Sequence, residues 1–295
     1  MSSSTQIDPS RLRIAAIRFL NPAPLMWDFE HPPLNTQLAR RYALDYMMPA
    51  ECAARLEDPI DSPHAADIGL VPVAALATNP HLRLIPGCAI ASRTRVRSIL
   101  LVRRAAQPLT DVRSVAADTS SQASLAYAQV LFRQWWNPEA AFIPHTPDLD
   151  SMLADDDAAI LIGDPALFAL EDRKARLQRT GEKLVYHDLA AEWIALTGLP
   201  WVSAVWAIRD QSLRRSGLTI DQLALDFTTS RDNGLDHLDD LVEEWATKLP
   251  LSADTIRTYL STNIYYSLDE SCQEGLGRFY ELAGATGVLP EFSLA

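Results

Sequence analysis

Hydroxyl and amide side chains gather at one point in the sequence, in the run Ser120-Ser121-Gln122-Ala123-Ser124. This run follows a short apolar segment and opens an amphipathic pattern that predicts a helix. The first turn of a helix has unpaired N–H groups and a partial positive charge, so it can hold a carboxylate or phosphate without a lysine. The alternative is a simple N-cap by one serine. Both stay open, because one cap needs only one hydroxyl.

Two further segments carry polar residues where predicted strands end. Asn21 lies in FLNPAPL (19–25), where it either forms a turn beside the prolines or lines the ligand crevice that the carboxyl ends of parallel strands create. In LIGDPA (161–166), Gly163 would let the backbone approach a ligand, whereas Asp164 is also a suitable helix N-cap.

Common catalytic signatures are absent from the sequence. It has no GxGxxG, GxxxxGK[ST], HExxH or GxSxG pattern, and its six histidines are scattered singly. Its three cysteines lack the CxxC spacing of zinc and redox sites and are predicted to be buried thiols: Cys52, Cys88 and Cys272. Nucleotide-dependent and zinc enzymes are therefore disfavoured, and no metal site is predicted.

Composition and charge narrow the class of partner. The 295 residues are 48% hydrophobic and 22% charged, which is typical of a folded protein. The net charge of −12 disfavours nucleic acids and anionic membranes as partners. Because no run of about 18 apolar residues occurs and the first 13 residues are polar, we expect a cytoplasmic protein without a membrane span.

The charge is unevenly distributed along the chain. Residues 1–104 carry a net +3 and the rest a net −15. Five arginines of residues 1–104 lie close together in the sequence, where they either bind an anion or form a solvated strand face. They are Arg93, Arg95, Arg97, Arg103 and Arg104.

Apolar runs bounded by turn residues alternate with helical patterns over the first two-thirds of the chain. This alternation predicts an α/β fold with helices covering a mainly parallel sheet. The clearest helix begins near Ser121, where one apolar stripe follows at helical spacing: Leu125, Ala128, Phe132 and Trp135. The predicted strands are 13–20, 43–48, 67–71, 88–92, 96–103, 114–117, 158–163, 184–187 and 202–209.

The last third is predicted to be mostly helical. Thr219 with Gln222, and Ser267 with Glu270, fit the capping box, so a helix should begin at each. Further helical patterns cover 233–248 and 253–261.

Two polar stretches after strong strands, 104–108 and 207–211, are the expected crossings between two lobes. Residues 1–105 and 210–295 would then form a discontinuous outer lobe, and residues 106–209 an inserted α/β lobe.

Several of these segments match a known family in order and content. The matching pieces are FLNPAPL (19–25), ADIGLVP (66–72), S-x-x-x-V-x-S-I (92–99), SSQAS (120–124), LIGDPA (161–166) and HDLAAEWIALTGLPWVSAVWA (187–207). The last piece is the most specific. Over nearly its whole length the sequence resembles the chorismate dehydratases of the futalosine route to menaquinone.

The resemblance implies a fold similar to type II periplasmic binding proteins, with two α/β lobes, a ligand cleft between them and a helical C-terminal region. It also implies a hydro-lyase that converts chorismate to 3-[(1-carboxyvinyl)oxy]benzoate, the first step of that route, without a metal or organic cofactor. The expected partner is this small dianionic substrate. The oligomeric state stays open, with a homodimer as one alternative.

Carried over residue by residue, the resemblance implies Asn21 and Ser98 as the catalytic residues. The implied substrate-binding residues are Ser120, Ser121, Gln122, Ser124, Gly163 and Asp164. Where the family commonly has S-R-T-S, residues 121–124 read SQAS, so a guanidinium and a hydroxyl are missing.

The front arginines do not replace that guanidinium if Ser98 faces the cleft. Alternation along a strand places Arg93, Arg95 and Arg97 on the face opposite Val96 and Ser98. The expected donors to the two carboxylates of the substrate are therefore hydroxyls and backbone amides.

Two other functions are compatible with the same residues. One is a non-catalytic small-anion binding protein of the same fold. The other is the sibling dihydroxynaphthoate synthase of the same route, although its members begin with a Ser-Pro-Asn type of motif in place of LNPAPL.

Overall fold

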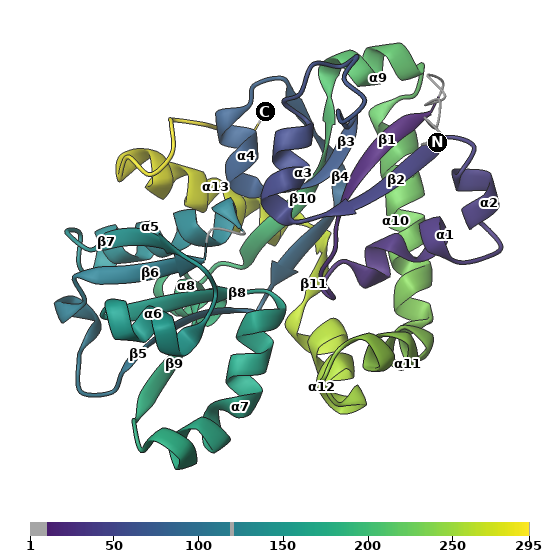
Figure 1. The fold of residues 1–295 in the computed structure, drawn as a ribbon. Helices are drawn as coiled ribbons and strands as arrows, with labels where there is room; N and C mark the ends of the chain where they lie inside the picture. The colour runs from purple at the N-terminus through teal and green to yellow at the C-terminus, as the bar shows by residue number, and fades with distance from the viewer. Residues whose placement is uncertain (1–10, 119–120, 295) are drawn as a thin grey trace, which may run out of the picture.

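The computed structural model describes residues 11–118 and 121–294, which form two sheets surrounded by helices (Figure 1). The first sheet has the strand order β11-β4-β10-β3-β1-β2, and the second has the order β7-β6-β8-β5-β9. The two-lobed α/β architecture expected from the sequence is thus confirmed. The strands are β1 (Leu12–Ile17), β2 (Tyr42–Met47), β3 (Ile68–Pro72), β4 (Leu82–Ser92), β5 (Ile99–Arg104), β6 (Ser114–Asp118), β7 (Ala141–His145), β8 (Ala158–Ile162), β9 (Leu184–Asp188), β10 (Trp201–Arg209) and β11 (Tyr265–Leu268).

Each sheet is mixed, not mainly parallel as expected. β1 runs parallel to β2 and β3, and β6 runs parallel to β7 and β8. In contrast, β10 is antiparallel to β3 and β4, and β5 is antiparallel to β8 and β9. These two antiparallel strands lie next to the two points where the chain changes sheet.

The chain changes sheet earlier than the sequence analysis placed the boundaries. β5 pairs within the second sheet and β10 within the first, so the crossings are 93–98 and 189–200, not the expected 104–108 and 207–211. The expected lobes, 1–105 with 210–295 and 106–209, are corrected accordingly. Residues Ile99 to Val102 are all buried, and a continuous apolar run does not indicate which sheet a strand joins. The strands β7, mostly exposed and containing Pro144, and β11, only four residues long, were missed for want of a clear pattern.

Helices cover both sheets and make up most of the last third, as expected. They are α1 (Trp27–Glu30), α2 (Asn35–Leu38), α3 (Pro49–Arg55), α4 (Val73–Thr78), α5 (Gln122–Trp135), α6 (Leu149–Asp155), α7 (Asp164–Thr180), α8 (Leu189–Thr197), α9 (Asp210–Ser216), α10 (Ile220–Asp236), α11 (Leu238–Lys248), α12 (Ala253–Thr258) and α13 (Glu270–Ala285). Two 3₁₀ segments, η1 (Ala23–Met26) and η2 (Leu109–Asp111), and the π-helix η3 (Tyr259–Asn263) complete the elements.

One of the two expected capping boxes is present. Thr219 Oγ1 accepts from Gln222 N at 3.2 Å, and Gln222 Oε1 accepts from Thr219 N at 2.8 Å. The expected box at Ser267 is wrong: Ser267 belongs to β11, and Asp269 caps α13 by accepting from Cys272 N at 3.0 Å. Ser267 and Glu270 have the spacing of a capping box, but β11 continues to Leu268, so the helix begins after Asp269 and this aspartate is its N-cap.

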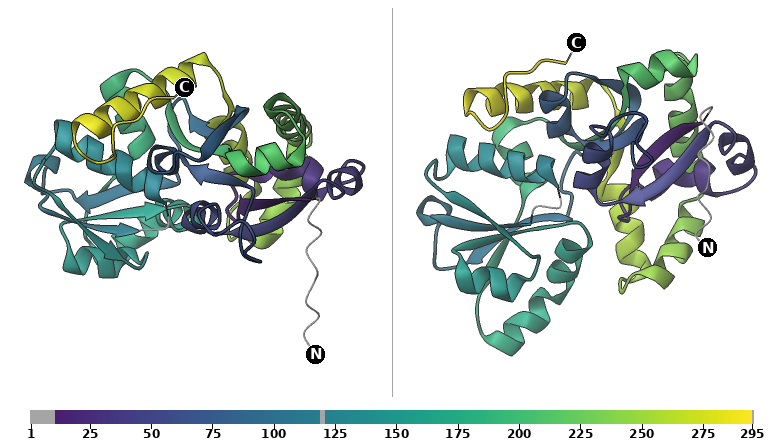
Figure 2. Two further views of the ribbon diagram at one scale, coloured as in Figure 1. Left: turned by 90° about the horizontal axis from the view of Figure 1, so that it is seen from above. Right: turned by 45° about the horizontal axis from the view of Figure 1, so that its top comes forward.

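An aromatic stack joins the two lobes. Tyr127 on α5 stacks on Trp201 of β10 with ring centroids 3.8 Å apart, and on Phe279 of α13 at 3.9 Å. Figure 2 shows α13 alongside α5, in agreement with their packing contacts. The hydrophobic core therefore continues from one lobe into the other.

The cysteines Cys52, Cys88 and Cys272 are buried free thiols, as expected.

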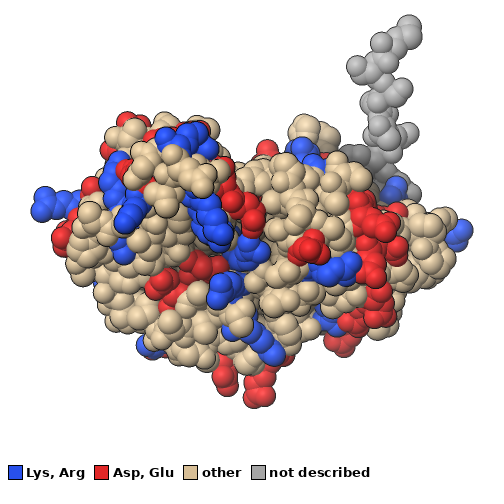
Figure 3. All heavy atoms as spheres, turned by 90° about the horizontal axis from the view of Figure 1, so that it is seen from below, with Lys and Arg blue, Asp and Glu red and all other residues tan. Residues whose placement is uncertain are grey.

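The surface carries both signs of charge. On the face seen in Figure 3, acidic and basic side chains are interspersed. Within the described part of the chain, no helix combines the length and apolar character needed to cross a membrane.

Close packing of α10 on η1 fixes the chain just after Asn21. A Cβ added at Gly234 would lie 2.2 Å from the carbonyl oxygen of Pro24, and Ser230 Oγ donates to Leu25 O at 2.9 Å. We predict that Gly234→Ala lowers the free energy of unfolding by about 1–3 kcal/mol, because the backbone of η1 must shift. Urea unfolding measures this change.

Gly277→Ala on α13 is the matched control, because nothing lies within 4 Å of its added Cβ. It should leave the stability unchanged or raise it by up to about 1 kcal/mol through helix propensity. An equal loss in the two variants would contradict the packing argument.

Candidate active site

A small cavity lies where strands of both sheets end. Its walls come from the loops after β1, β3, β6 and β8, from the crossing 93–98 and from β10. Its volume is about 40 Å³, which is room for about three water molecules. The lining residues are Ile17, Phe19, Asn21, Pro49, Pro72, Val96, Ser98, Ile99, Ser121, Ser124, Ile162, Gly163, Ser203 and Ala204. Five of the eight residues expected in the site therefore meet at one cavity.

Asn21 enters the cavity from the loop between β1 and η1. Its Oδ1 atom is buried and has no hydrogen-bond partner among the described residues. A buried acceptor without a partner costs about 1–3 kcal/mol. The amide is therefore set to accept a hydrogen bond from a ligand, and its Nδ2 atom can donate one.

Ser98 lies at the end of the first crossing, directly before β5. Its side chain is buried, and its Oγ accepts a hydrogen bond of 2.8 Å from the Tyr259 hydroxyl. Its carbonyl oxygen accepts from Gly163 N at 2.7 Å. Ser98 is thus held by residues from two different parts of the chain.

Ser121 and Ser124 line the cavity from the first turn of α5. Ser121 is the N-cap, accepting from Ser124 N at 3.4 Å and from Ser124 Oγ at 3.1 Å. The N-cap alternative is therefore confirmed for Ser121, and because the pair faces the cavity, anion binding by this segment stays a prediction. Free N–H groups in the same turn favour a bound carboxylate.

Gln122 and Ser120 are the two other residues of this segment that were expected to bind substrate. Gln122 is exposed, because the next helical positions, Ala123 and Ser124, turn inward and Gln122 points away from them. Gln122 therefore does not line this cavity, and its contact with substrate stays a prediction. Ser120 lies outside the described residues.

Gly163 brings the second lobe into contact with the first. Its φ of +70° favours glycine, and an added Cβ would lie 2.9 Å from Cε2 of Phe19. Gly163 is also the N-cap of α7, with no side-chain cap. The alternative that Asp164 caps this helix is therefore wrong.

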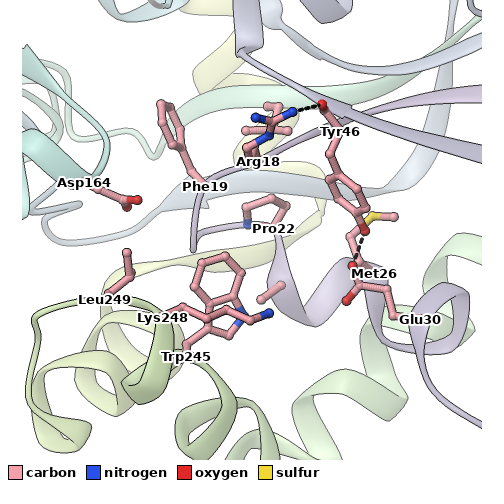
Figure 4. A pocket seen from close by; sticks show the side chains of 12 residues that line it. Arg18, Phe19, Pro22, Met26, Glu30, Tyr46, Asp164, Trp245, Lys248 and Leu249 are labelled. Atoms are coloured by element: carbon pink, nitrogen blue, oxygen red, sulfur yellow. Dashed lines mark hydrogen bonds between the residues drawn. The ribbon is translucent and has the colours of Figure 1, made fainter.

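The Asp164 carboxylate instead points across to the first lobe (Figure 4). Burial raises its pKa from 3.8 to about 6, and a hydrogen bond from the backbone N–H of Leu20 opposes the shift. It lines a neighbouring cavity of about 410 Å³, whose other walls include Tyr46 and Trp245. Asp164 therefore lies beside the small cavity, not in it.

Phe19 borders three cavities. It lines the small cavity, the 410 Å³ cavity and a third of about 560 Å³ on the side of Met48 and His145. The side chain of Phe19 therefore forms part of the wall of the small cavity and of both larger cavities.

The residues that line the small cavity carry no formal charge. Arg97 turns to Glu171, and Arg93 to Asp269 and the Tyr265 ring, 3.9 Å from its centroid. The expectation that these arginines face away from the site agrees with this placement. Over residues 11–118 and 121–294, no group of three or more His, Cys, Asp or Glu side chains is placed to hold a metal ion.

A family model described as menaquinone biosynthesis matches residues 12–285. The chain belongs to the menaquinone biosynthesis family. It is also 31% identical over 214 residues to a chorismate dehydratase from Thermus thermophilus, covering 69% of this chain and 74% of that protein. Menaquinone biosynthesis is therefore the pathway in which this chain acts.

Solved structures share the fold of this family member. A protein from Archaeoglobus fulgidus superposes with a TM-score of 0.68 at 15% identity, covering 95% of this chain and 99% of that one. The alkanesulfonate-binding protein of Xanthomonas axonopodis pv. citri, bound to MOPS, has a TM-score of 0.62 at 16% identity, with 96% and 95% covered. The fold is that of the periplasmic binding proteins.

Sequence reasoning missed several residues at or beside the cavity, among them Pro72, Ser203 and Tyr259. Pro72 and Ser203 line it and lie in two of the motifs that carried the resemblance, 66–72 and 187–207, so those motifs were the available signal. Tyr259, which donates to Ser98, lies in a segment without a motif.

The raised pKa of Asp164 predicts a pH-dependent contribution to stability. The folded state holds the proton more tightly than the unfolded state, so stability falls as pH rises from about 4 through about 6. Asp164→Asn keeps an acceptor for Leu20 N–H but cannot ionise. Its free energy of unfolding, relative to wild type, should therefore rise by up to about 2 kcal/mol between pH 4.5 and pH 8. Urea unfolding at both pH values tests this, and a pH-independent difference would contradict it.

Proposed function

We propose that the protein is a hydro-lyase that dehydrates chorismate to 3-[(1-carboxyvinyl)oxy]benzoate, the first step of the futalosine route to menaquinone. The observation that carries the proposal is the unpartnered Oδ1 of Asn21 beside Ser98 in a buried, uncharged cavity. The similarity to a chorismate dehydratase supports the choice of substrate.

The reaction requires loss of one ring proton and one hydroxyl. Removing the proton from the ring carbon that bears the enolpyruvyl ether leaves an anion that spreads through the diene toward the ring carboxylate. Departure of the neighbouring hydroxyl then makes the ring aromatic, which supplies much of the driving force. The hydroxide and the proton together leave as water, so no oxidant or reductant is consumed.

The protein's part is to place hydrogen-bond donors where negative charge grows. Donors fixed before the reaction stabilise such charge strongly in a site that excludes bulk water. Asn21 Oδ1 accepts from the substrate hydroxyl, and Nδ2 donates to its oxygen as it leaves. An amide is too weak a base to take the ring proton, so a substrate carboxylate or a water takes it.

The serines hold the carboxylates of the dianion. Ser121 and Ser124 offer hydroxyls at the first turn of α5, and Ser98 offers one from the opposite wall. Neutral donors suffice here, because backbone N–H groups and a helix N-terminus attract an anion without a lysine.

Substrate entry requires the cleft to open. The space between the lobes holds about three waters in this closed arrangement. Chorismate therefore binds when the lobes separate or when the Phe19 ring turns into one of the larger cavities that it borders.

Incubation of the purified protein with chorismate alone tests the proposal. We expect a product with benzenoid absorbance and a mass lower by one water. Tight binding of unchanged chorismate would instead support the anion-binding alternative, and conversion of a cyclic futalosine derivative would support the sibling synthase.

Substitutions at two lining residues separate chemistry from binding. Asn21→Ala should lower kcat by about 10²–10³-fold, because it removes donors aimed at charge that develops only during reaction. Ser124→Ala should mainly raise KM, about tenfold, because it contacts a carboxylate that is present throughout. Steady-state kinetics on folded variants measures both. An unchanged kcat for Asn21→Ala would remove Asn21 from the catalytic set.

A further inference from the structure

A π-helix places a tyrosine against the cavity serine. The chain leaves α12 as the five-residue π-helix Tyr259–Asn263, a rare form that widens a helical turn and redirects its side chains. Tyr259 is only 2% exposed, and its hydroxyl reaches Ser98 Oγ across 161 positions of sequence. The contact therefore ties the C-terminal helical region to the first crossing.

The geometry gives the direction of this hydrogen bond, with the Tyr259 hydroxyl as donor to Ser98 Oγ. Burial raises the pKa of Tyr259 far above its ordinary value, so the phenol keeps the proton that it donates. Ser98 Oγ accepts this bond at 2.8 Å, and no other hydrogen bond to that atom is present within the described part of the chain. The hydrogen of Ser98 itself is then free to point elsewhere.

The surroundings of Ser98 favour one direction for its hydroxyl hydrogen, toward the small cavity. Ser98 Oγ is bounded by Tyr259 on one side, and the Ser98 side chain lines the small cavity on the other. Its backbone is held as well, because Asp188 accepts from Arg97 N at 2.6 Å and Ser98 O accepts from Gly163 N. With the main chain fixed, the hydrogen bond from Tyr259 is the contact that orients the hydroxyl.

We propose that Tyr259 is a positioning residue that turns the Ser98 hydroxyl into the cavity as a donor to the substrate. The kinetic part of this inference rests on the proposed function, whereas the geometric part does not. Without the tyrosine hydroxyl, Ser98 would be free to rotate and would meet the substrate as a donor only part of the time.

The first test is Tyr259→Phe, which removes one oxygen and keeps the ring. We expect kcat to fall about 10- to 100-fold with KM changed less than about threefold. Tyr266→Phe is the matched control, because Tyr266 is also a buried tyrosine, 3% exposed, and its hydroxyl has no partner among the described residues. It should leave kcat unchanged, and equal losses in the two variants would overturn the proposal.

A double-mutant cycle separates positioning from a general effect on packing. In the Ser98→Ala background, Tyr259→Phe should cause no further loss of kcat, because the hydroxyl that it orients is gone. Independent, multiplicative losses would overturn the proposal.

A crystal structure of Tyr259→Phe keeps the inference testable if chorismate is not turned over. We expect the Ser98 side chain to leave its wild-type rotamer or to occupy two. A single unchanged rotamer would overturn the inference whatever the activity, whereas an inactive wild-type protein would overturn only the proposed function.

Discussion

One carboxylate, that of Asp188, holds the segment on which the site depends. Its oxygens accept from Val96 N at 3.2 Å, Arg97 N at 2.6 Å and Ala191 N at 3.0 Å, so it caps α8 and fixes the first crossing at once. Arg97 has a φ of +61°, which costs a residue with a Cβ about 1–2 kcal/mol. The hydrogen bond to its N–H offsets that cost. Burial raises the pKa of Asp188, and the backbone N–H donors that surround the carboxylate oppose the shift.

The acidic protein separates its fixed charges from the candidate site, which suits the dianionic substrate proposed for it. The chain carries a net −12, yet the cavity is lined by amides, hydroxyls and apolar groups. Two arginines of the first crossing form ion pairs away from the cavity, Arg93 with Asp269 and Arg97 with Glu171. Neutral donors at a helix N-terminus favour the anion locally, and they do so without a cation that would hold the product as firmly as the substrate.

From the sequence we could predict the site residues that follow strand ends. We could not predict those whose position depends on packing between distant segments of the chain. Asn21 and Gly163 were found because β1 and β8 end just before them, and the end of a buried strand is readable from apolar periodicity. The sheet to which β5 belongs was misjudged, because an apolar run fits either sheet. Tyr259 was invisible, since its partner lies 161 positions away and the π-turn that aims it has no sequence pattern. The resemblance marked Asp188 within its most specific motif without indicating its structural role.

The turn Gly163–Asp164 sets the separation of the two residues proposed as catalytic. Gly163 N donates to the carbonyl of Ser98, which places one wall of the cavity. Asp164 accepts from the N–H of Leu20, the residue before Asn21, while Gly163 abuts Phe19. A single turn of the second lobe thus touches the backbone on both sides of the cavity. Under the proposed function, closing the lobes around this turn would both expel water and bring Asn21 and Ser98 together, so that an open cleft would admit the substrate without reacting with it.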